Sequence, residues 1–555
     1  MQEIKSILQK IIQDLYGLDF TPELTPSPEN ISADYSTNAP LKLAKTLHKS
    51  PIQIAEELSQ AIVGNPIINP ENGIFISSPG FLNFNLSDEY LNTAIDNYTT
   101  DFAQNISYGE YQNKTIICEF SDPNPFKVLH VGHLYTSIVG DSISRLFEYA
   151  GARVIRANFG GDVGLHVAKT MYILQQKDTS SLQIEDIANC YIAGTAAYDE
   201  DSSAHERITK LNKEIYQINH DKIHGTPLAD LYWHARELSY DYFRDFYKQI
   251  GVQFDKYYPE STVAALGLAT VKEQLAKGIY EYSDGAVIFN GDKFGLHTRV
   301  FINKEGVPTY ETKDVGLIFT KWQDYHFDKS VVITGSEQLD YMKVVLKSIE
   351  QYAPELTSRT THLTHGLVKL PGNIKMSSRK GNFLKAVDVL DMIKDELKVE
   401  YNSTDENVAL AATKYAFLKY KMGGNIIFDP QESVKMTGNS GPYLLYSAVR
   451  AKKILAKIVK PQNTQQASTL NSSERQLAKK LLEYKPVLQE SVAELAPHKV
   501  ANYLYELAQA FSRFYESCPV AGSDKEQVRA RLVQVYLNTI SHGLDLLGIN
   551  IPEEM

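Results

Sequence analysis

The hydrophobic pattern of residues 114–158 predicts a strand, a helix and a second strand. Residues 114–120 alternate and carry a run of β-branched residues, which is typical of a buried strand. From Gly132 onward apolar residues recur at helical spacing, and Gly151 stands where that helix should end. Residues 153–158 predict the second strand. The segment is therefore expected to be one repeat of a doubly wound parallel sheet, with a phosphate-facing turn before its helix.

The pattern on either side predicts two further domains. Near the N-terminus, a helical stripe and a turn between extended segments at 74–86 favour an α+β domain. Beyond Asn382 the sequence is helical, with apolar stripes such as the one in residues 500–515, and it favours an all-α helix bundle. Between them we expect a Rossmann-like α/β domain, interrupted by polar helical sequence. The expected boundaries are 1–105, 106–385 with an insertion at about 175–280, and 386–555.

The composition is that of a soluble globular chain with several domains. Its 555 residues exceed what one core supports, and 43% hydrophobic and 22% charged residues are ordinary values. Three cysteines far apart in the sequence offer neither a disulfide framework nor a Cys-x-x-Cys metal site, so no zinc is expected. Charged residues occur among the first apolar positions, and no apolar run approaches membrane-spanning length. We therefore expect a cytoplasmic protein with no membrane partner.

The charge balance does not decide between classes of partner. A net charge of −11, from 67 acidic and 56 basic residues, disfavours a nucleic-acid partner when it is taken alone. It excludes none, because phosphate contacts need only a local basic face. The class of partner has to be decided from the residues that carry candidate chemistry.

The turn before the predicted helix carries the first such residues. A helix N-terminus attracts phosphate through its unpaired N–H groups and the positive end of its dipole. His130 and His133 stand three residues apart at this end, on one face, and Gly132 leaves room for a flat ring against the backbone. At this point two histidines that merely cap a helix remain an equal alternative.

A basic loop far downstream changes that balance. The segment Lys375-Met-Ser-Ser-Arg-Lys380-Gly-Asn follows an apolar segment at 363–370, and alone it would be solvated surface. Together with His-Val-Gly-His after a first strand, it resembles the two signatures of class I aminoacyl-tRNA synthetases. Each half is weak, but the joint match is strong.

Within that class, the chain resembles the arginyl-tRNA synthetases over nearly its whole length. The motifs that carry the resemblance are Glu119-Phe-Ser-Asp-Pro-Asn124-Pro-Phe-Lys127, Asn158-Phe-Gly-Gly-Asp162-Val-Gly164, Tyr310-Glu-Thr-Lys-Asp314, Gly335-Ser-Glu-Gln338, Gly441-Pro-Tyr443-Leu-Leu-Tyr446 and Phe511-Ser-Arg-Phe-Tyr515. The resemblance implies an arginine–tRNA ligase, an enzyme that uses ATP with Mg²⁺ to join L-arginine to tRNA(Arg). It also implies a monomer without a tightly bound cofactor.

The resemblance assigns roles to residues of these motifs. Catalytic and ATP-binding roles fall to Lys127, His130, Gly132, His133, Lys375, Met376 and Lys380. The arginine pocket is expected to contain Glu119, Asp122, Asn124, His133, Tyr310, Asp314 and Gln338. Carboxylates can meet a planar guanidinium with paired hydrogen bonds, and a neutral analogue would leave them unpaired. Such a pocket can reject a neutral analogue of arginine without a separate editing site. No metal ligand is expected.

Residues that contact tRNA are expected in both outer domains. They are Phe81, Asn83, Tyr443, Tyr446, Arg450 and Met555. Phe81 and Asn83 fit an exposed aromatic ring and an amide that recognise a flipped-out base, although Phe81 fits a core position almost equally. Tyr443, Tyr446 and Arg450 share a helix face suited to bases and phosphate, and Tyr443 also fits a buried position. Met555 is expected beside the anticodon loop.

Several positions depart from the family pattern. Ser378 stands where the basic loop usually has a second lysine, and the resemblance points to Lys127 as its replacement. Tyr135, Val163 and Asp122 also replace commoner residues. Of these departures, Tyr135 and Ser378 favour one alternative, a catalytically weak relative that binds tRNA as a regulatory or chaperone module. A class I synthetase for lysine is a second alternative.

Overall fold

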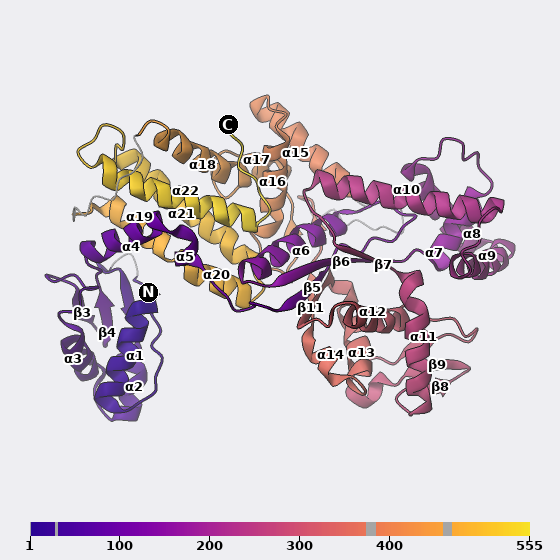
Figure 1. Cartoon of the computed structure of the whole chain (residues 1–555), viewed down its shortest axis with the longest axis horizontal. Coiled ribbons are helices and arrows are strands. Elements are labelled where there is room, and N and C mark those ends of the chain that lie inside the picture. Colours follow the sequence, from indigo (N-terminus) through magenta and orange to yellow (C-terminus); the bar gives the residue numbers. More distant parts are fainter. Residues whose placement is uncertain (1, 28–30, 373–383, 459–468) are drawn as a thin grey trace.

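A five-stranded parallel sheet lies at the centre of the chain (Figure 1). Its strands are β5 Thr115–Glu119, β6 Arg153–Gly160, β7 Lys256–Pro259, β11 Lys329–Gly335 and β12 Thr360–His365. They lie in the order β12-β11-β5-β6-β7, so the chain builds outward from β5 and then returns to its other side. The strand order reverses between β5 and β11, which is where ligands bind in sheets of this kind. The computed structural model describes residues 2–27, 31–372, 384–458 and 469–555.

The predicted strand–helix–strand unit is confirmed. Helix α6 (Val131–Tyr149) connects β5 to β6, and the two strands pair in parallel from Thr115 opposite Arg153 to Glu119 opposite Ala157. One face of α6 packs on the sheet, and a Cβ at Gly140 would lie 2.1 Å from the ring of Phe120. This close approach fixes the middle of α6 against Phe120, the residue that follows β5.

Helices and a small antiparallel sheet complete the central domain. Its further helices are α7 Leu165–Leu174, α11 Glu260–Ala276, α12 Tyr310–Tyr325, α13 Leu339–Glu350 and α14 Pro354–Arg359. The small sheet joins β8 Glu281–Ser283, β9 Ala286–Phe289 and β10 Arg299–Ile302 in the order β10-β9-β8. The short helices η1 Gly291–Phe294 and η2 Ser336–Gln338 precede β10 and α13.

The insertion consists of three helices, as its polar helical sequence predicts. They are α8 Ile184–Glu200, α9 Ser202–His220 and α10 Pro227–Gln249, at the right of Figure 1. We expected the insertion to reach about residue 280, but the chain is back in the main sheet at Lys256, where β7 pairs with β6. Only four residues form this edge strand, too few for a clear periodic signal.

The N-terminal domain is α+β, in agreement with its predicted fold class. Its antiparallel sheet has the order β1-β2-β4-β3. Helix α1 packs against α3, and its residues Ile4, Leu8 and Ile12 are buried in the core of the domain. Its elements are α1 Gln2–Tyr16, β1 Thr25–Pro26, β2 Tyr35–Thr37, α2 Ala39–Leu47, α3 Pro51–Ile62, β3 Ile74–Ser77 and β4 Phe81–Phe84, followed by α4 Asp88–Thr100 and α5 Phe102–Ile106.

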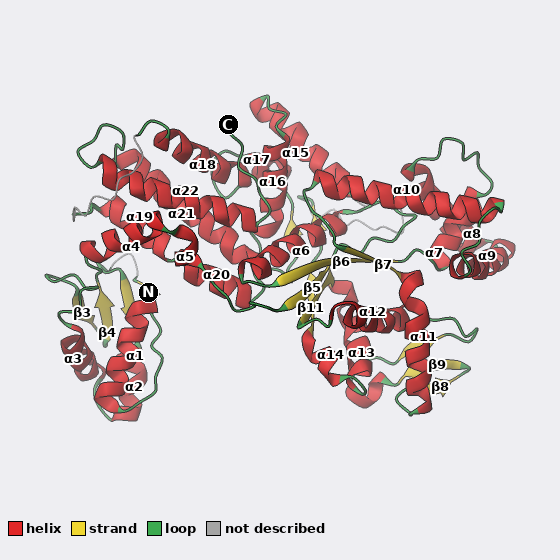
Figure 2. Ribbon diagram, viewed as in Figure 1, coloured by secondary structure: helices red, strands yellow, loops and turns green. Residues whose placement is uncertain are grey.

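The C-terminal part is helical (Figure 2), which confirms the predicted bundle. Its helices are α15 Ala386–Tyr401, α16 Glu406–Leu418, α17 Pro430–Val434, α18 Gly441–Leu455, α19 Ser472–Leu482, α20 Tyr484–Ala493, α21 Pro497–Ser517 and α22 Glu526–Leu546. A short parallel pair, β13 Val368–Lys369 with β14 Ile426–Ile427, links this part to the central domain. Arg475 of α19 contacts Asp34 and Asp88 and so joins the bundle to the N-terminal domain.

Candidate active site

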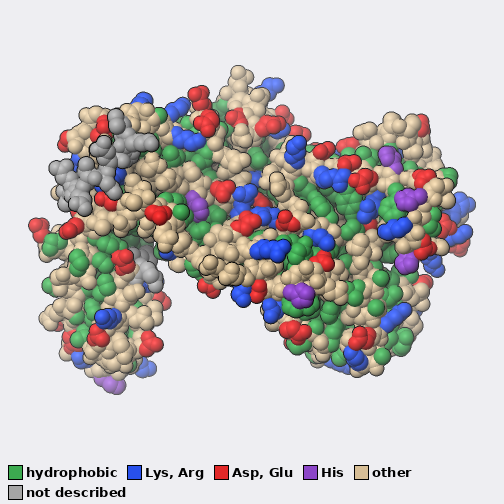
Figure 3. Space-filling view, in the orientation of Figure 1, with side chains coloured by type: hydrophobic (Ala, Val, Ile, Leu, Met, Phe, Trp, Pro, Cys, Tyr) green, Lys and Arg blue, Asp and Glu red, His purple; other side chains and the backbone are tan. Residues whose placement is uncertain are grey.

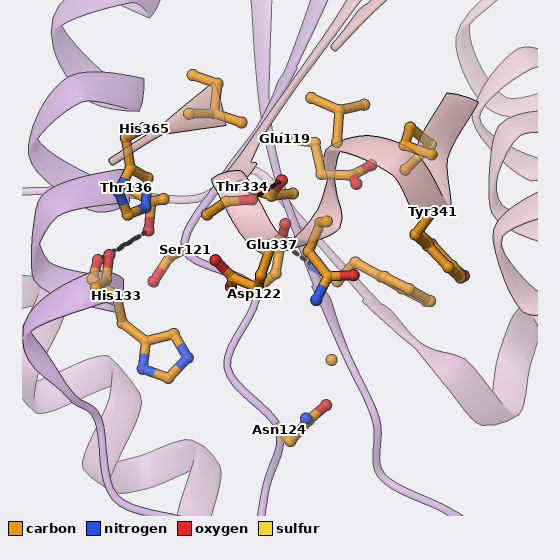
Figure 4. Close-up of a pocket in the computed structure, with 18 of the residues that line it drawn as sticks. Glu119, Ser121, Asp122, Asn124, His133, Thr136, Thr334, Glu337, Tyr341 and His365 are labelled. Carbon is orange, nitrogen blue, oxygen red and sulfur yellow. Dashed lines mark hydrogen bonds between the residues drawn. The ribbon is translucent and has the colours of Figure 1, made fainter. Parts of the chain in front are cut away.

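A cavity of about 610 Å³ opens at the carboxyl ends of the central strands. Its walls include Glu119 at the end of β5, Gly160 at the end of β6, Thr334 near the end of β11 and His365 at the end of β12. The cavity thus lies at the reversal of strand order between β5 and β11. In Figure 4, His133, Thr136 and His365 lie on one side of it, and Glu119, Asp122 and Tyr341 lie toward the other.

Hydrogen bonds and ring stacking hold the two histidines in place at the start of α6. His130 is the N-cap residue, and its Nδ1 accepts a hydrogen bond from the Gly132 N–H at 3.0 Å. The His133 Nδ1 accepts one from the His130 N–H at 3.1 Å, and the two rings stack with centroids 3.8 Å apart. Because each Nδ1 is an acceptor, the proton of each neutral ring is assigned to Nε2. Each ring can therefore donate one hydrogen bond from Nε2.

Both imidazoles are neutral at physiological pH. Burial lowers the pKa of His130 to about 4, and the positive charge of Lys127 acts in the same direction. Burial and the neighbouring His130 hold the pKa of His133 well below its usual range. The pair is therefore suited to contact phosphate oxygens as neutral N–H donors beside the positive helix end.

Gly132 is required by the histidine pair itself. A Cβ at this position would lie 2.8 Å from Cε1 and 2.9 Å from Nδ1 of His130. We expected the absence of a side chain to admit a ligand ring, and the structure places the His130 ring against this backbone. A larger residue would displace the N-cap.

The opposite side of the cavity is acidic. Glu119 and Asp314 are buried, and Asp122 is nearly so. Lys321 Nζ donates a hydrogen bond to Glu119 Oε2 at 2.6 Å. The Phe159 N–H donates to Asp122 Oδ1 at 2.8 Å, and the Tyr341 hydroxyl donates to Asp314. Lys321 is the only cation that forms an ion pair with any of these three acids in the described part of the chain.

This surplus of carboxyl groups raises their proton affinity. Burial raises the pKa of Asp314 to about 8, and the charges of Glu119, Glu260 and Glu311 add to the effect. Burial, followed by the charge of Glu119, raises the pKa of Asp122 well above its usual value. A cation that enters this site removes the repulsion, so the cluster favours a positively charged ligand.

The other predicted arginine-site residues also line the cavity. Asn124 Oδ1 accepts the Gly161 N–H at 2.7 Å, which fixes the side chain against the end of β6. Tyr310 and Gln338 lie at the rim, both with exposed side chains. The structure therefore brings these three together with Glu119, Asp122, Asp314, His130, Gly132 and His133 around one cavity.

Of the predicted catalytic lysines, Lys127 is the one that the structure describes, and it does not line this cavity. The Lys127 Nζ lies 4.3 Å from the ring centroid of Tyr191 in α8. Its charge reaches the site, since it contributes to the lowered pKa of both histidines. Lys375, Met376 and Lys380 lie outside the described residues.

Several cavity residues were not predicted. They are Thr136, Glu260, Arg299, Glu311, Glu337, Tyr341 and His365. Glu311 and Glu337 lie within motifs that were already singled out, so proximity in sequence was an available signal. Arg299, in a short antiparallel strand, and Glu260, at the start of α11, carry no pattern that indicates a site.

Asn83 lies where a base cannot reach it. Its side chain is fully buried in β4, where Oδ1 accepts from the Ser36 hydroxyl at 2.6 Å and Nδ2 donates to the Ser77 hydroxyl at 3.0 Å. The expectation of an exposed amide was therefore wrong, because a strand residue that points inward needs its polar groups satisfied within the domain. Phe81, at the start of the same strand, is half-buried.

Two of the expected tRNA residues of α18, Tyr446 and Arg450, form a cluster at the surface. Arg450 Nη2 donates to the Tyr446 hydroxyl at 2.7 Å, and the guanidinium carbon lies 4.6 Å from the ring centroids of both Tyr446 and Tyr515. Tyr515, in α21, was not among the predicted residues. Tyr443 is half-buried and shares a hydrogen bond with Ser512, which fits the buried alternative in part. Met555 is partly buried against the hydrophobic core.

Two departures from the family pattern are accommodated by packing. The ring of Tyr135 is buried between His365 and Phe417, at centroid distances of 4.5 and 5.4 Å. Its hydroxyl has no hydrogen-bond partner among the described residues. Val163 is fully buried in the core that joins α7 to the insertion.

The described residues offer neither a metal-binding cluster nor a membrane-spanning helix. They contain no group of three or more His, Cys, Asp or Glu side chains that could hold a metal ion. Nor does any helix formed by them have the length and apolar character needed to cross a membrane.

Comparisons with known proteins bear on the whole chain. Residues 2–86 match the arginyl tRNA synthetase N terminal domain, residues 100–429 the catalytic domain of tRNA synthetases class I (R), and residues 444–555 the DALR anticodon binding domain. A relative from Treponema denticola, named arginine–tRNA ligase, is 29% identical over 606 residues, which cover 100% of both chains. One of the same name from Bdellovibrio bacteriovorus is 30% identical over 80% of both chains. Thermus thermophilus arginyl-tRNA synthetase has a similar fold, with a TM-score of 0.79 at 22% identity over 100% of both chains.

Proposed function

Because the chain belongs to the class I arginyl-tRNA synthetase family and is an arginine–tRNA ligase, we propose that it activates arginine in the cavity between β5 and β11. The observation that carries this proposal is the composition of that cavity. Two neutral imidazoles at a helix N-terminus line one side, and a surplus of buried carboxyl groups lines the other. The first side suits phosphate and the second suits a guanidinium.

The acidic side binds the arginine side chain. Asp314 and Glu119 accept hydrogen bonds from the guanidinium, while Tyr310 and Gln338 close the rim over it. A planar fork of five donors matches such a set of acceptors, and a neutral side chain would leave buried carboxylates unpaired. Asn124 and His133, which lie toward the nucleotide side, hold the amino-acid backbone.

The histidine side binds ATP. His130 and His133 donate from Nε2 to phosphate oxygens, and the positive end of the α6 dipole adds to the attraction. The arginine carboxylate attacks the α-phosphorus in line, the bond to the bridging oxygen breaks, and pyrophosphate leaves as arginyl-adenylate forms. Charge develops on the phosphate oxygens during this step, so fixed donors and cations accelerate it. Lys127, Lys375 and Lys380 supply the cations, and Mg²⁺ arrives with ATP as its complex.

The second step transfers arginine to tRNA. A ribose hydroxyl of the terminal adenosine attacks the carbonyl carbon of the adenylate, the carbon–oxygen bond to phosphate breaks, and AMP leaves. The insertion α8–α10 holds the acceptor end. Acidic and basic side chains are interspersed over the face shown in Figure 3, so tRNA contact rests on local sites such as the Tyr446–Arg450 cluster. A cytoplasmic monomer is part of the same proposal.

Arginine-dependent exchange of pyrophosphate into ATP, run with and without tRNA, tests this function. Asp314→Asn should raise the KM for arginine by at least tenfold and leave the KM for ATP within about twofold, because it removes a charge from one side of the cavity only. An unchanged arginine KM would remove Asp314 from the pocket. A catalytically weak tRNA-binding relative is not favoured, and it would require no exchange in either condition. Competition between arginine and lysine separates the lysine alternative.

A further inference from the structure

Tyr341 connects the acidic side of the cavity to Arg299, a cation that also lines it. Its side chain lies in the first turn of α13 and lines the cavity (Figure 4). The hydroxyl donates to Asp314 Oδ2, and the guanidinium carbon of Arg299 lies 5.2 Å from the centroid of the ring. Arg299 Nη1 also pairs with Glu311 Oε1 at 3.3 Å. The side chain of Tyr341 is thus held by Asp314 through its hydroxyl and by Arg299 through its ring.

Three of the acids that face Asp314 come from three different elements, and each of the three has a cation of its own. Asp122, which also faces Asp314, forms no ion pair within the described ranges. Glu119 of β5 pairs with Lys321 at 2.6 Å, Glu260 of α11 pairs with Lys313 at 2.5 Å, and Glu311 of α12 pairs with Arg299. These three acids are also the charges that act on Asp314.

Asp314 itself has no ion pair within the described ranges, and the neutral Tyr341 hydroxyl is its hydrogen-bond donor. A neutral donor orients a carboxylate without cancelling its charge. When Asp314 is ionised, its second oxygen therefore carries a charge at the cavity wall that no cation of the described residues matches.

We propose that Tyr341 is a positioning residue for arginine, whose hydroxyl holds one oxygen of Asp314 so that the other oxygen receives the substrate guanidinium. The inference rests on the proposed function, in which Asp314 binds arginine. A lysine or arginine in place of Tyr341 would satisfy Asp314 internally and would compete with the substrate. A phenylalanine would keep the shape and leave the carboxyl group without its orienting donor.

The arrangement also predicts proton release when arginine binds. Burial raises the pKa of Asp314 to about 8, while the Tyr341 hydrogen bond lowers it. Near pH 7 the free enzyme therefore holds Asp314 largely protonated, and the guanidinium binds its ionised form. The KM for arginine should fall as the pH rises toward 8 and should level off above it. Loss of the hydroxyl removes a contribution that lowers the pKa, so the fall should move to higher pH.

Tyr341→Phe tests the inference, with Tyr352→Phe as the matched control. Tyr352 follows the same helix, its hydroxyl bonds to that of Tyr280 at 3.2 Å, and it does not line the cavity. With tRNA present throughout, Tyr341→Phe should raise the arginine KM about tenfold at pH 7 and less at pH 9, with the ATP KM within about twofold. Tyr352→Phe should change neither constant. An arginine KM that is unchanged, or raised equally at every pH, would overturn the inference.

Calorimetry of the wild-type enzyme gives a test that does not depend on how the variant folds. Arginine binding measured in two buffers of different ionisation enthalpy should release protons at pH 7 and fewer at pH 9. Binding without proton release at pH 7 would overturn the inference and leave the proposed function standing. Absence of arginine-dependent exchange in the wild type would instead refute the proposed function.

Discussion

The ammonium group of Lys321 lies 2.6 Å from a carboxylate oxygen of Glu119, and both side chains are closed to solvent. The Ser330 hydroxyl accepts a second hydrogen bond from Lys321 at 3.2 Å. This pair joins α12 to β5, the first strand of the sheet in chain order. Removal of the cation would leave a buried charge without a partner.

Lys321→Met should therefore destabilise the protein by about 3–5 kcal/mol, the usual consequence of breaking a buried pair from one side. The measurement is the melting temperature. Lys277→Met provides the control, because its pair with Glu273 in α11 is exposed and contributes little. Equal melting temperatures for the two variants would contradict a structural role for the buried pair.

Asp314→Asn should stabilise the protein at alkaline pH even though it weakens arginine binding. Burial raises the pKa of Asp314 from 3.8 to about 8. A raised carboxyl pKa gives stability that is complete below the unfolded pKa and is lost as the pH rises through the folded pKa. The variant should melt several degrees above the wild type at pH 8.5, and the difference should shrink toward pH 6.

Asp340→Asn is the control for this pH dependence. Asp340 is exposed in the same region, and a hydrogen bond from Lys343 lowers its pKa. That variant should show no gain at alkaline pH. A wild-type enzyme that is more stable than Asp314→Asn at pH 8.5 would mean that Asp314 is ionised at little cost in the folded chain.

The sequence predicted the residues that belong to continuous motifs better than their surroundings. His130, Gly132 and His133 follow a strongly periodic strand–helix unit, and the structure places them at its turn. The pairing of Glu119 with Lys321 could not be predicted, since 202 positions separate them and neither periodicity nor composition relates them. The same holds for Arg299, which reaches the cavity from a strand outside the main sheet.

Burial was the other property that the sequence did not reveal. Asn83 alternates with apolar neighbours in β4, a pattern that fits an outward side chain as well as a buried one with internal partners. In Tyr443, Tyr446 and Arg450 the helical spacing correctly indicated one face. The second element of the cluster, Tyr515 in α21, depends on how two helices pack and has no local signal.

His130→Asn should keep the fold and lose catalysis. Asparagine is a favourable N-cap, so its side-chain oxygen can replace Nδ1 as acceptor for the Gly132 N–H. It cannot replace the Nε2 donor, so kcat for arginine-dependent pyrophosphate exchange should fall about 100-fold while the melting temperature stays within about 2 °C. The exposed His205 in α9 supplies a control, His205→Asn, which should remain fully active. Since burial lowers the pKa of His130 to about 4, wild-type activity should show no imidazole titration between pH 6 and 8.

Asn83→Ala and Phe81→Ala should separate stability from tRNA contact in the N-terminal domain. Asn83→Ala leaves the Ser36 and Ser77 hydroxyls without their buried partner and should destabilise the domain by about 1–3 kcal/mol. Phe81→Ala should raise the KM for tRNA with a smaller effect on stability. Limited proteolysis reports the first effect and aminoacylation kinetics the second. A raised tRNA KM in a stable Asn83→Ala variant would restore the base contact that the structure contradicts.

Tyr446→Ala should impair tRNA use without affecting the adenylate chemistry. The Arg450 guanidinium lies between the rings of Tyr446 and Tyr515, which are 40% and 42% exposed. Each ring therefore keeps surface on which a base can stack, and the cation between them can meet phosphate. Loss of one stacking platform should raise the tRNA KM about tenfold, with the arginine KM unchanged at saturating tRNA.

The control is Tyr420→Ala, because Tyr420 is 44% exposed in the same helical region and Lys419 lies near its ring, but neither belongs to the cluster. A nonspecific effect of losing an exposed tyrosine beside a cation would appear in both variants. Arg450→Gln adds a second criterion, since removal of one phosphate contact should also reduce the salt dependence of tRNA binding by about one ion. If Tyr446→Ala and Tyr420→Ala have the same tRNA KM, the cluster is surface packing and tRNA binds elsewhere on the bundle.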